Sequence, residues 1–388
     1  MTLCLLTVHG IGFQQPPTGE RAGYADALHT NLRAKLDDLL ADDPELPEHP
    51  LYVFSQAADP DRNNLERLSE AAPLGPTGTV VHVALVYSPL EELAPRAGSV
   101  ADVLVRAGLA HSNYVSTVGA LRLVLSDAWA ALHEHGRVES SSSLRPRSDQ
   151  AIVAHHRGLT EVLHKRPDAG TSEPGALGIL RALEDDMATY VARNDLRERV
   201  RGFVQEALVR VLAREDIDTV VLNTHSQGTM IGWDVLARLP FARLRDDRGG
   251  QSEKLHAFVT AGSPIRKYVD MFAWGGRVGQ MADLLVRPDF VWHNYWDKHD
   301  PVADPLDPGR PWKPSEAPPE DGCPSDEDSL LVRIDPSDGS AHHVHVEDHQ
   351  VDNVANSSGG GLQAHDYWNN NTQFVAPLSS LLEGALKA

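Results

Sequence analysis

The chain has 388 residues, which is long enough to bury one large hydrophobic core or two smaller ones. Its formal net charge of −20 at pH 7 argues against nucleic acid as a partner, because phosphate binding requires a basic surface, and it disfavours unassisted binding to anionic membranes. No apolar run approaches the ~20 residues of a membrane-spanning helix, so we expect a globular protein without stable membrane insertion.

The first predicted element is a short buried strand over residues 3–8, an apolar run that leads directly into the His-Gly-Ile-Gly loop at 9–12. Glycines let such a loop turn sharply and point a backbone N–H outward. The N-terminal residues lack the basic stretch and the small-residue cleavage site of a secretory signal, so we expect a cytoplasmic protein. In that reducing environment, Cys4 and Cys323 are expected to remain unbridged.

Helix and strand signals then alternate along the chain. Leucines at helical spacing predict a helix over about 28–40, which ends at the Asp-Asp-Pro sequence of 42–44. Short runs rich in β-branched and aromatic residues predict strands at 51–54 and 79–87. Together with the first strand, these elements indicate the beginning of an α/β core.

From residue 90 to residue 215 the strand signal disappears, and apolar residues recur at helical spacing. We interpret 90–215 as a helical insertion, or cap, placed between core strands. Its last helix, around 200–212, is expected to belong to the core and to pack on the sheet just before the next strand. The core would then comprise residues 1–89 and 216–388.

The segment after this insertion carries the most informative pattern. Residues 220–222 predict a buried strand, and the sequence Asn-Thr-His-Ser-Gln-Gly then turns into a helix that runs to about residue 239. This order is typical of a nucleophile elbow, a tight strand-to-helix turn that exposes a serine hydroxyl, here that of Ser226. The turn is crowded and needs small residues two positions away. Gly228 meets that need, whereas Thr224 stands where the usual pattern has glycine.

Strands and helices alternate again toward the C-terminus. Strands are predicted at 255–261 and 290–296, and the Pro-, Asp- and Glu-rich stretch 305–327 is expected to be an exposed loop. A terminal helix is predicted within 367–386, with a break near Pro377. Apolar strands that alternate with helices predict a mostly parallel sheet covered on both faces.

The His-Gly loop and the Thr-His-Ser-Gln-Gly turn, in this order, resemble the α/β-hydrolase superfamily and within it the lipase and esterase branch. The resemblance covers both ends of the chain and not its middle. It implies an α/β fold with a helical cap before the nucleophile strand, and a serine hydrolase without cofactor or metal. It further implies that backbone N–H groups of Ile11 and Gln227 form an oxyanion hole. His9, Gly10 and Gly228 would support these loops.

The remaining members of a catalytic triad should follow the serine in the order acid, then histidine. Asp297 and Asp300 follow the strand at 290–296, and the Asp-Pro-Val portion resembles the segment that carries the acid in many family members. We therefore choose Asp300, with Asp297 as the alternative. His365 follows a glycine-rich loop, and the surrounding Ala-His-Asp-Tyr-Trp run resembles the segment that carries the triad histidine.

Three further features lie near these candidates. His225 precedes the nucleophile, and we expect the turn to point it away from the base. The Gly-Ser-Pro sequence of 262–264 either lines the site or is a plain turn after a strand. Apolar residues within 268–274 favour core packing over a substrate-contacting lid.

A dense run of histidines and acids spans residues 342–349. If this run is one strand, four groups share one face because side chains alternate along a strand; they are His343, His345, Glu347 and His349. Such groups suit zinc or a related metal, yet no familiar spaced metal motif is present. We therefore assign no metal ligand here and interpret the run as a partly exposed strand or hairpin.

The function expected from these residues is hydrolysis of a carboxylic or lipid-like ester by a Ser-His-Asp triad. The same triad could serve a phospholipase, a lipid deacylase or an acyltransferase. A catalytically silent binding protein with this fold is the alternative outside the enzymes, and a metal-dependent hydrolase built on 342–349 is another. The substrate, its acyl length and the oligomeric state stay open.

Overall fold

The structure is a computed structural model of the chain. It describes residues 1–10, 22–55, 64–87, 190, 194–239, 251–265, 284, 287–297, 300, 302–303, 305–306, 332–334, 341–343, 346–356 and 363–387. Several predictions fall outside these residues; they concern Ile11, the cap over 90–189, the segment 268–274, most of the loop at 305–327, and Cys323.

The centre of the molecule is an eight-stranded sheet in the order β10-β7-β6-β5-β1-β4-β2, with β3 also paired to β4. Its strands are β1 (Leu3–Val8), β2 (Leu40–Ala41), β3 (Leu51–Phe54), β4 (Val80–Val86), β5 (Thr219–His225), β6 (Leu255–Ala261), β7 (Val291–Asp297) and β10 (Glu347–Val351). All of its pairings among the described residues are parallel. The prediction of an α/β fold with a mostly parallel sheet is therefore confirmed. A separate antiparallel pair consists of β8 (Val332–Ile334) and β9 (Ala341–His343).

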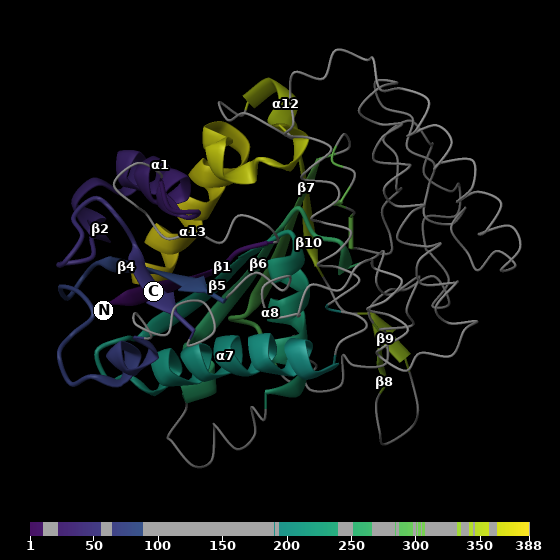
Figure 1. The fold of residues 1–388 in the computed structure, drawn as a ribbon. Coiled ribbons are helices and arrows are strands. Elements are labelled where there is room, and N and C mark those ends of the chain that lie inside the picture. The colour runs from purple at the N-terminus through teal and green to yellow at the C-terminus, as the bar shows by residue number, and fades with distance from the viewer. Residues whose placement is uncertain are drawn as a thin grey trace, which may run out of the picture.

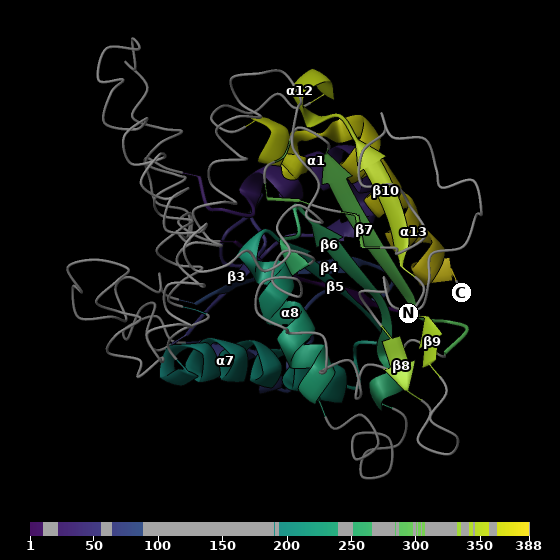
Figure 2. The same cartoon turned by 90° about the vertical axis from the view of Figure 1, so that its right-hand side faces the viewer.

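Helices cover both faces of the sheet, as Figures 1 and 2 show. One face carries α1 (Asp26–Leu36) and α13 (Ala376–Lys387), and the other carries α7 (Asn194–Ala213) and α8 (Gln227–Arg238). The shorter helical elements are η1 (Asp37–Leu39), η2 (Leu65–Ser69), η4 (Gln251–Lys254), α12 (Asn353–Asn356), η7 (Gln363–His365), η8 (Tyr367–Asn369) and the π-helical turn η9 (Asn371–Val375). No helix among the described residues is both long and apolar enough to span a membrane.

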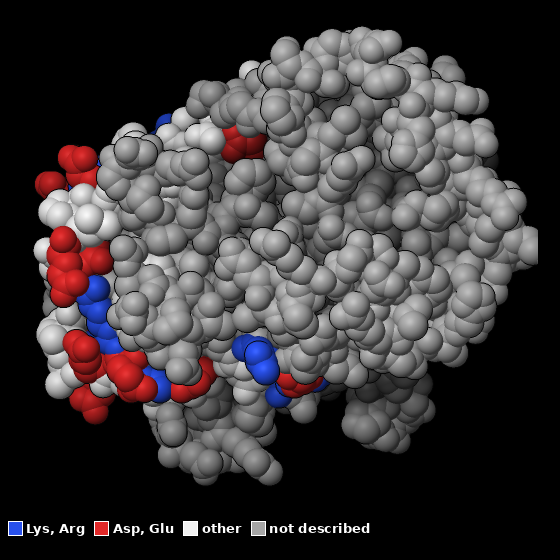
Figure 3. Space-filling view, viewed as in Figure 1, with Lys and Arg blue, Asp and Glu red and all other residues white. Residues whose placement is uncertain are grey.

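The outer face of α7 carries both acidic and basic side chains. Arg210 binds Glu66 of η2 at 2.8 Å and Glu206, one turn earlier on α7, at 2.7 Å. Figure 3 shows acidic and basic side chains interspersed on the described part of this side of the molecule. Exposed pairs of this kind each contribute at most about 1 kcal/mol, so they are not what holds α7 in place.

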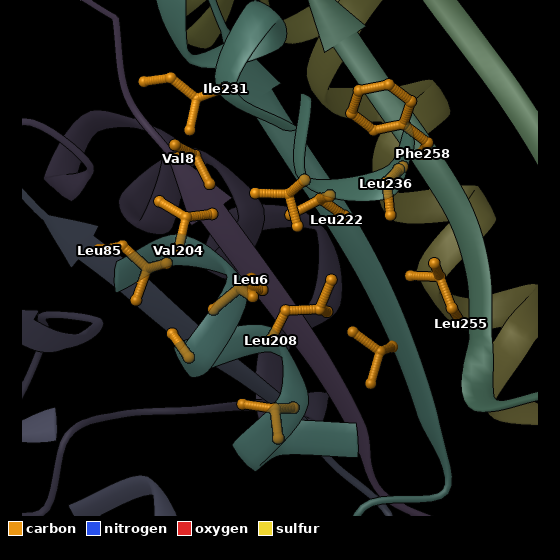
Figure 4. Close-up of a cluster of buried hydrophobic side chains, with 14 of the residues drawn as sticks. Leu6, Val8, Leu85, Val204, Leu208, Leu222, Ile231, Leu236, Leu255 and Phe258 are labelled. Carbon is orange, nitrogen blue, oxygen red and sulfur yellow. The ribbon is translucent and has the colours of Figure 1, made fainter. Parts of the chain in front are cut away.

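The inner face of α7 packs into a large apolar cluster between the sheet and the α7/α8 layer (Figure 4). The cluster includes Leu6 and Val8 of β1, Leu222 of β5, Val204 and Leu208 of α7, and Ile231 and Leu236 of α8. Leu3 and Leu5, which alternate with Leu6 along β1, pack instead on the α1/α13 side. Both faces of the strand are buried, which explains why residues 3–8 are a continuous apolar run in the sequence.

Two predicted elements differ from the structure. Helix α1 ends at Leu36 rather than near 40, because Asp37 adopts a positive φ of 48° and Leu40 joins β2. The run over 342–349, expected to be a partly exposed strand or hairpin, belongs instead to two strands that are not paired with each other: His343 ends β9, which pairs with β8, and Glu347 begins β10, which pairs with β7. Because β9 and β10 belong to different sheets, residues 342–349 do not form one continuous strand. At the C-terminus, α13 begins at Ala376, directly after the π-helical turn η9 ends at Val375, so the predicted break near Pro377 corresponds to a change of helix type.

Candidate active site

Ser226 forms the turn between β5 and α8, and its backbone adopts φ 55° and ψ −128°. A positive φ is unfavourable for a residue with a side chain and persists only where neighbours hold it. Here the Ser226 N–H donates to the Ala261 carbonyl at 2.9 Å. The Ser226 carbonyl accepts from the N–H of Thr229 at 3.0 Å and from its hydroxyl at 2.7 Å. The strained peptide is thus anchored on both sides.

The loop after β1 lies directly against this turn, and two glycines make the contact close. A Cβ on Gly10 would lie 2.4 Å from the Ser226 Cβ and 2.9 Å from its Oγ. A Cβ on Gly228 would lie 2.4 Å from the His9 carbonyl oxygen and 2.6 Å from that of Val8. Both positions therefore require glycine for steric reasons. The parallel pairing of β1 with β5, which sets Val8 opposite Thr224, brings the two loops together.

Thr224, which departs from the usual small residue, is accommodated by a further glycine. Its hydroxyl donates to the Val259 carbonyl at 2.9 Å. Its methyl group lies against Gly232 of α8, where a Cβ would come within 2.9 Å of that methyl carbon. The absence of a side chain at Gly232 of α8 thus leaves room for the larger Thr224 side chain on β5.

His9 is enclosed by aromatic rings and holds the loop from within. Its ring stacks on Tyr87, with 4.1 Å between centroids, and meets the edge of Tyr24 at 4.6 Å. Its Nδ1 bonds the Gly10 carbonyl, and the Tyr87 hydroxyl donates to the His9 carbonyl at 3.0 Å. Burial lowers the pKa of His9 to about 3, so its ring is neutral at pH 7. These contacts fit the predicted bracing role; Ile11, beside it, lies outside the described residues.

Asp300, which follows β7, and His365, the last residue of η7, are in contact. His365 Nδ1 lies 2.8 Å from Asp300 Oδ2, and the Asp300 side chain is fully buried. The other Asp300 oxygen accepts from the Val302 N–H at 2.9 Å. Burial alone would raise the pKa of Asp300, but His365 and these hydrogen bonds hold it below its usual value. The carboxylate accepts, so Nδ1 donates, and in a neutral ring Nε2 is the acceptor.

The His365 ring is lodged beside the residues that flank Ser226. A Cβ on Gly262 would lie 2.7 Å from the ring carbon Cε1, and Gly262 adopts a positive φ of 65°. Gly262 follows Ala261, the residue that binds the Ser226 N–H. The buried His365 Nε2 has no hydrogen-bond partner within the part of the chain that the structure describes. Among the described residues, this nitrogen is thus an unpartnered atom of a ring that packs against Gly262 and His225, next to the Ser226 turn.

His225 does not point away from the base, and that prediction was wrong. Its Nε2 bonds the His365 carbonyl at 3.0 Å, and the two rings lie 4.6 Å apart. Alternation along β5 turns its side chain toward the α1/α13 face, where the segment that carries His365 and Trp368 packs. Burial, aided by nearby His365, lowers the pKa of His225 to about 3.

The two candidate acids have different hydrogen-bond partners. Asp300 bonds the His365 ring, whereas Asp297 Oδ2 accepts from the backbone N–H of Asn353 at 2.6 Å. The Asn353 side chain in turn donates to the Ala364 carbonyl at 2.7 Å, directly before His365. Asp297 thus fixes the segment that presents the histidine. The backbone joins the two acids as well, because the Asp300 N–H donates to the Asp297 carbonyl at 3.0 Å.

Sequence reasoning missed Tyr367 and Asn353. The Tyr367 hydroxyl donates to Asp300 Oδ2 at 2.8 Å and accepts from the Asp297 N–H at 2.9 Å, so it holds both acids. Tyr367 belongs to the run around His365, but nothing in that run reveals which group its hydroxyl meets. No local signal marks Asn353. Both roles arise from tertiary contacts across more than 50 residues of sequence.

One further group of side chains in the described residues has the composition of a metal site. The ligand atoms of His293, Glu347 and His349 all lie within 4.8 Å of one another. Two of these residues belong to the run at 342–349, and the third, His293, was not singled out from the sequence.

Comparison of the chain with models of protein families, with curated proteins and with solved structures gave no match. The function is therefore inferred from the residues and their geometry.

Proposed function

We propose that the chain is a serine hydrolase of the α/β-hydrolase type that cleaves carboxylic esters. Ser226 is the nucleophile, His365 the general base and Asp300 the acid that orients it. The observation that carries the proposal is the 2.8 Å contact between buried Asp300 and His365 Nδ1, in a ring that packs against His225, the residue before Ser226. Acyl transfer through serine needs a nucleophile, a general base, an acid that orients the base, and an oxyanion hole. Ser226, His365 and Asp300 would supply the first three.

The chemistry follows from the roles of these atoms. Ser226 Oγ attacks the ester carbonyl carbon while His365 Nε2 takes the hydroxyl proton, and Asp300 stabilises the resulting imidazolium. The tetrahedral intermediate expels the alcohol, which leaves with that proton. A water molecule, deprotonated by His365, then attacks the acyl-serine ester, and the carboxylic acid is released as Ser226 regains its proton.

The oxyanion hole is the fourth part. Negative charge on the carbonyl oxygen would be stabilised by the backbone N–H of Gln227, the first residue of α8, where the helix dipole also favours an anion. The family resemblance adds the N–H of Ile11. Gly10, packed against the Ser226 side chain, would bring this second loop into reach.

The proposal extends to the architecture around the site. A helical cap within 90–215 would precede the nucleophile strand, and its last helix corresponds to α7, which packs on the sheet. Such a cap would select the substrate, which we take to be a small or lipid-like ester. No cofactor or metal enters the proposed reaction.

The direct test is hydrolysis of p-nitrophenyl esters of increasing acyl length. Ser226→Ala should lower kcat/KM by at least about 10³-fold for every ester that the wild type cleaves, because it removes the nucleophile. Ser379→Ala is the matched control, since Ser379 is also buried and, among the described residues, its hydroxyl donates to the Ala376 carbonyl of α13. Full activity in Ser226→Ala, or no activity in well-folded wild type on any ester, would count against the proposal.

A further inference from the structure

Three ligand-capable side chains meet where the edge strand β10 pairs with β7. His293 Nδ1 lies 2.9 Å from His349 Nε2 and 3.2 Å from Glu347 Oε2, and the remaining separation, Glu347 to His349, is 4.0 Å. The strand register sets Glu347 directly opposite His293 and places His349 opposite Tyr295. Side chains two residues apart share a face of a strand, so all three project to the same side of the sheet.

Two of these separations are close to what a tetrahedral metal requires, and the Glu347–His349 separation would have to shorten. Zinc binds histidine nitrogen at roughly 2.0–2.1 Å, so neighbouring ligand atoms on a tetrahedron lie roughly 3.3 Å apart. The three observed distances lie on both sides of that value. Two imidazoles and one carboxylate form a donor set that suits Zn²⁺, with a fourth position left for water.

The surroundings both support the cluster and leave it reachable. The His349 ring stacks on Tyr295, with 4.7 Å between centroids, which fixes the orientation of the imidazole. His293 is 15% exposed, whereas Glu347 and His349 are 44% and 38% exposed. An ion could therefore enter from solvent and be held from beneath by the half-buried His293.

We propose that His293, Glu347 and His349 bind one Zn²⁺ ion, which clips the edge strand β10 to β7. Among the described strands β10 pairs with β7 alone, so a metal bridge would secure this edge of the sheet. Both strands lead into the candidate active site: β7 ends at Asp297, and β10 is followed by Asn353, the residue that binds Asp297. The ion would thus stabilise the segments that present Asp300 and His365.

The ion would not take part in the reaction at Ser226. His293 pairs with Val259, and Val259 pairs with Asn223, which precedes Ser226 by three residues. Three residues along a strand and two strands across a sheet each correspond to about 10 Å. The proposed zinc site is therefore a structural one, and it does not depend on the proposed esterase function.

The test is titration of tag-free, chelator-stripped protein with Zn²⁺ in competition with a chromophoric chelator. We expect one tight site per chain and a higher melting temperature with zinc, because an ion that binds the folded state stabilises it. Glu347→Gln and His349→Gln should each weaken this site at least tenfold. Glu383→Gln is the matched control, since Glu383 is a half-exposed carboxylate on α13 that, among the described residues, pairs with Lys387. Circular dichroism of each metal-free variant verifies its fold.

Two results would overturn the zinc site. One is the absence of any site tighter than the weak binding expected of a chain with 19 histidines. The other is equal affinity in the wild type and in folded His349→Gln. Failure of this inference is distinguishable from failure of the proposed function, because Ser226→Ala should bind zinc as the wild type does. Stripped wild type should still react at Ser226 at temperatures well below its melting point.

Discussion

At the scale of single residues, Asp297 and Asp300 show how two buried carboxylates in one turn acquire different roles. Asp300 bonds an imidazole that can change its charge, whereas Asp297 bonds a backbone N–H that cannot. Tyr367 touches both, since its hydroxyl donates to the Asp300 carboxylate and accepts from the Asp297 backbone. We therefore expect substitution of either acid to lower stability, and substitution of Asp300 alone to abolish catalysis.

Asp300→Asn should lower kcat/KM about 10⁴-fold, because an amide cannot hold the His365 tautomer or stabilise its charged form. Both Asp300→Asn and Asp297→Asn should lower the free energy of unfolding by about 1–3 kcal/mol, because each weakens buried charged hydrogen bonds, but Asp297→Asn should largely keep kcat/KM. Ester hydrolysis and urea unfolding of both variants measure this. A reversed pattern, with catalysis lost only in Asp297→Asn, would assign the triad acid to Asp297.

At the scale of elements, the position of the strands could be predicted from the sequence because every central strand is buried on both faces. The apolar runs at 3–8 and 255–261 match β1 and β6 residue for residue. The turn at Ser226 could also be located, since crowding restricts which residues fit there. Side-chain directions across elements could not be predicted. His225 and Tyr367 meet groups distant in sequence, and the histidine run at 342–349 divides between two sheets.

The two loops of the site should tolerate no added side chain. Gly10→Ala would place a Cβ 2.4 Å from the Ser226 Cβ, so the loop or the nucleophile must move and activity should fall at least about 10²-fold. Gly384→Ala in α13 is the matched control, because no atom lies within 4 Å of the new Cβ. It should keep full activity and raise the free energy of unfolding by about 0.4–1 kcal/mol. Wild-type activity in Gly10→Ala would show that this loop does not support the nucleophile.

At the scale of the whole molecule, several buried histidines tie stability to pH. Burial lowers the pKa of His9 and His225 to about 3, and burial with the nearby Arg33 charge lowers that of His29 to about 4. In the unfolded chain these groups titrate near 6.5, so below that pH the unfolded state binds more protons than the folded state. Stability is therefore fully present above about pH 6.5 and is lost as pH falls toward the folded values.

Between pH 6.5 and pH 5, each of these histidines should lower the free energy of unfolding by at most about 2 kcal/mol. Relief of repulsion among the acidic groups opposes this loss, but it begins mainly near pH 4, where carboxylates titrate. Urea unfolding midpoints measured at pH 7 and pH 5 test the sign. Equal or greater stability at pH 5 would mean that these histidines are not held neutral in the folded protein.

The central claim, that Ser226 is an activated nucleophile, is tested most directly by reaction with a fluorophosphonate, followed by intact-mass and peptide analysis. We predict one adduct per chain, located on Ser226, absent in Ser226→Ala, present in Ser379→Ala and unaffected by a chelator. No adduct on well-folded wild type, or an adduct that persists in Ser226→Ala, would contradict the proposed function.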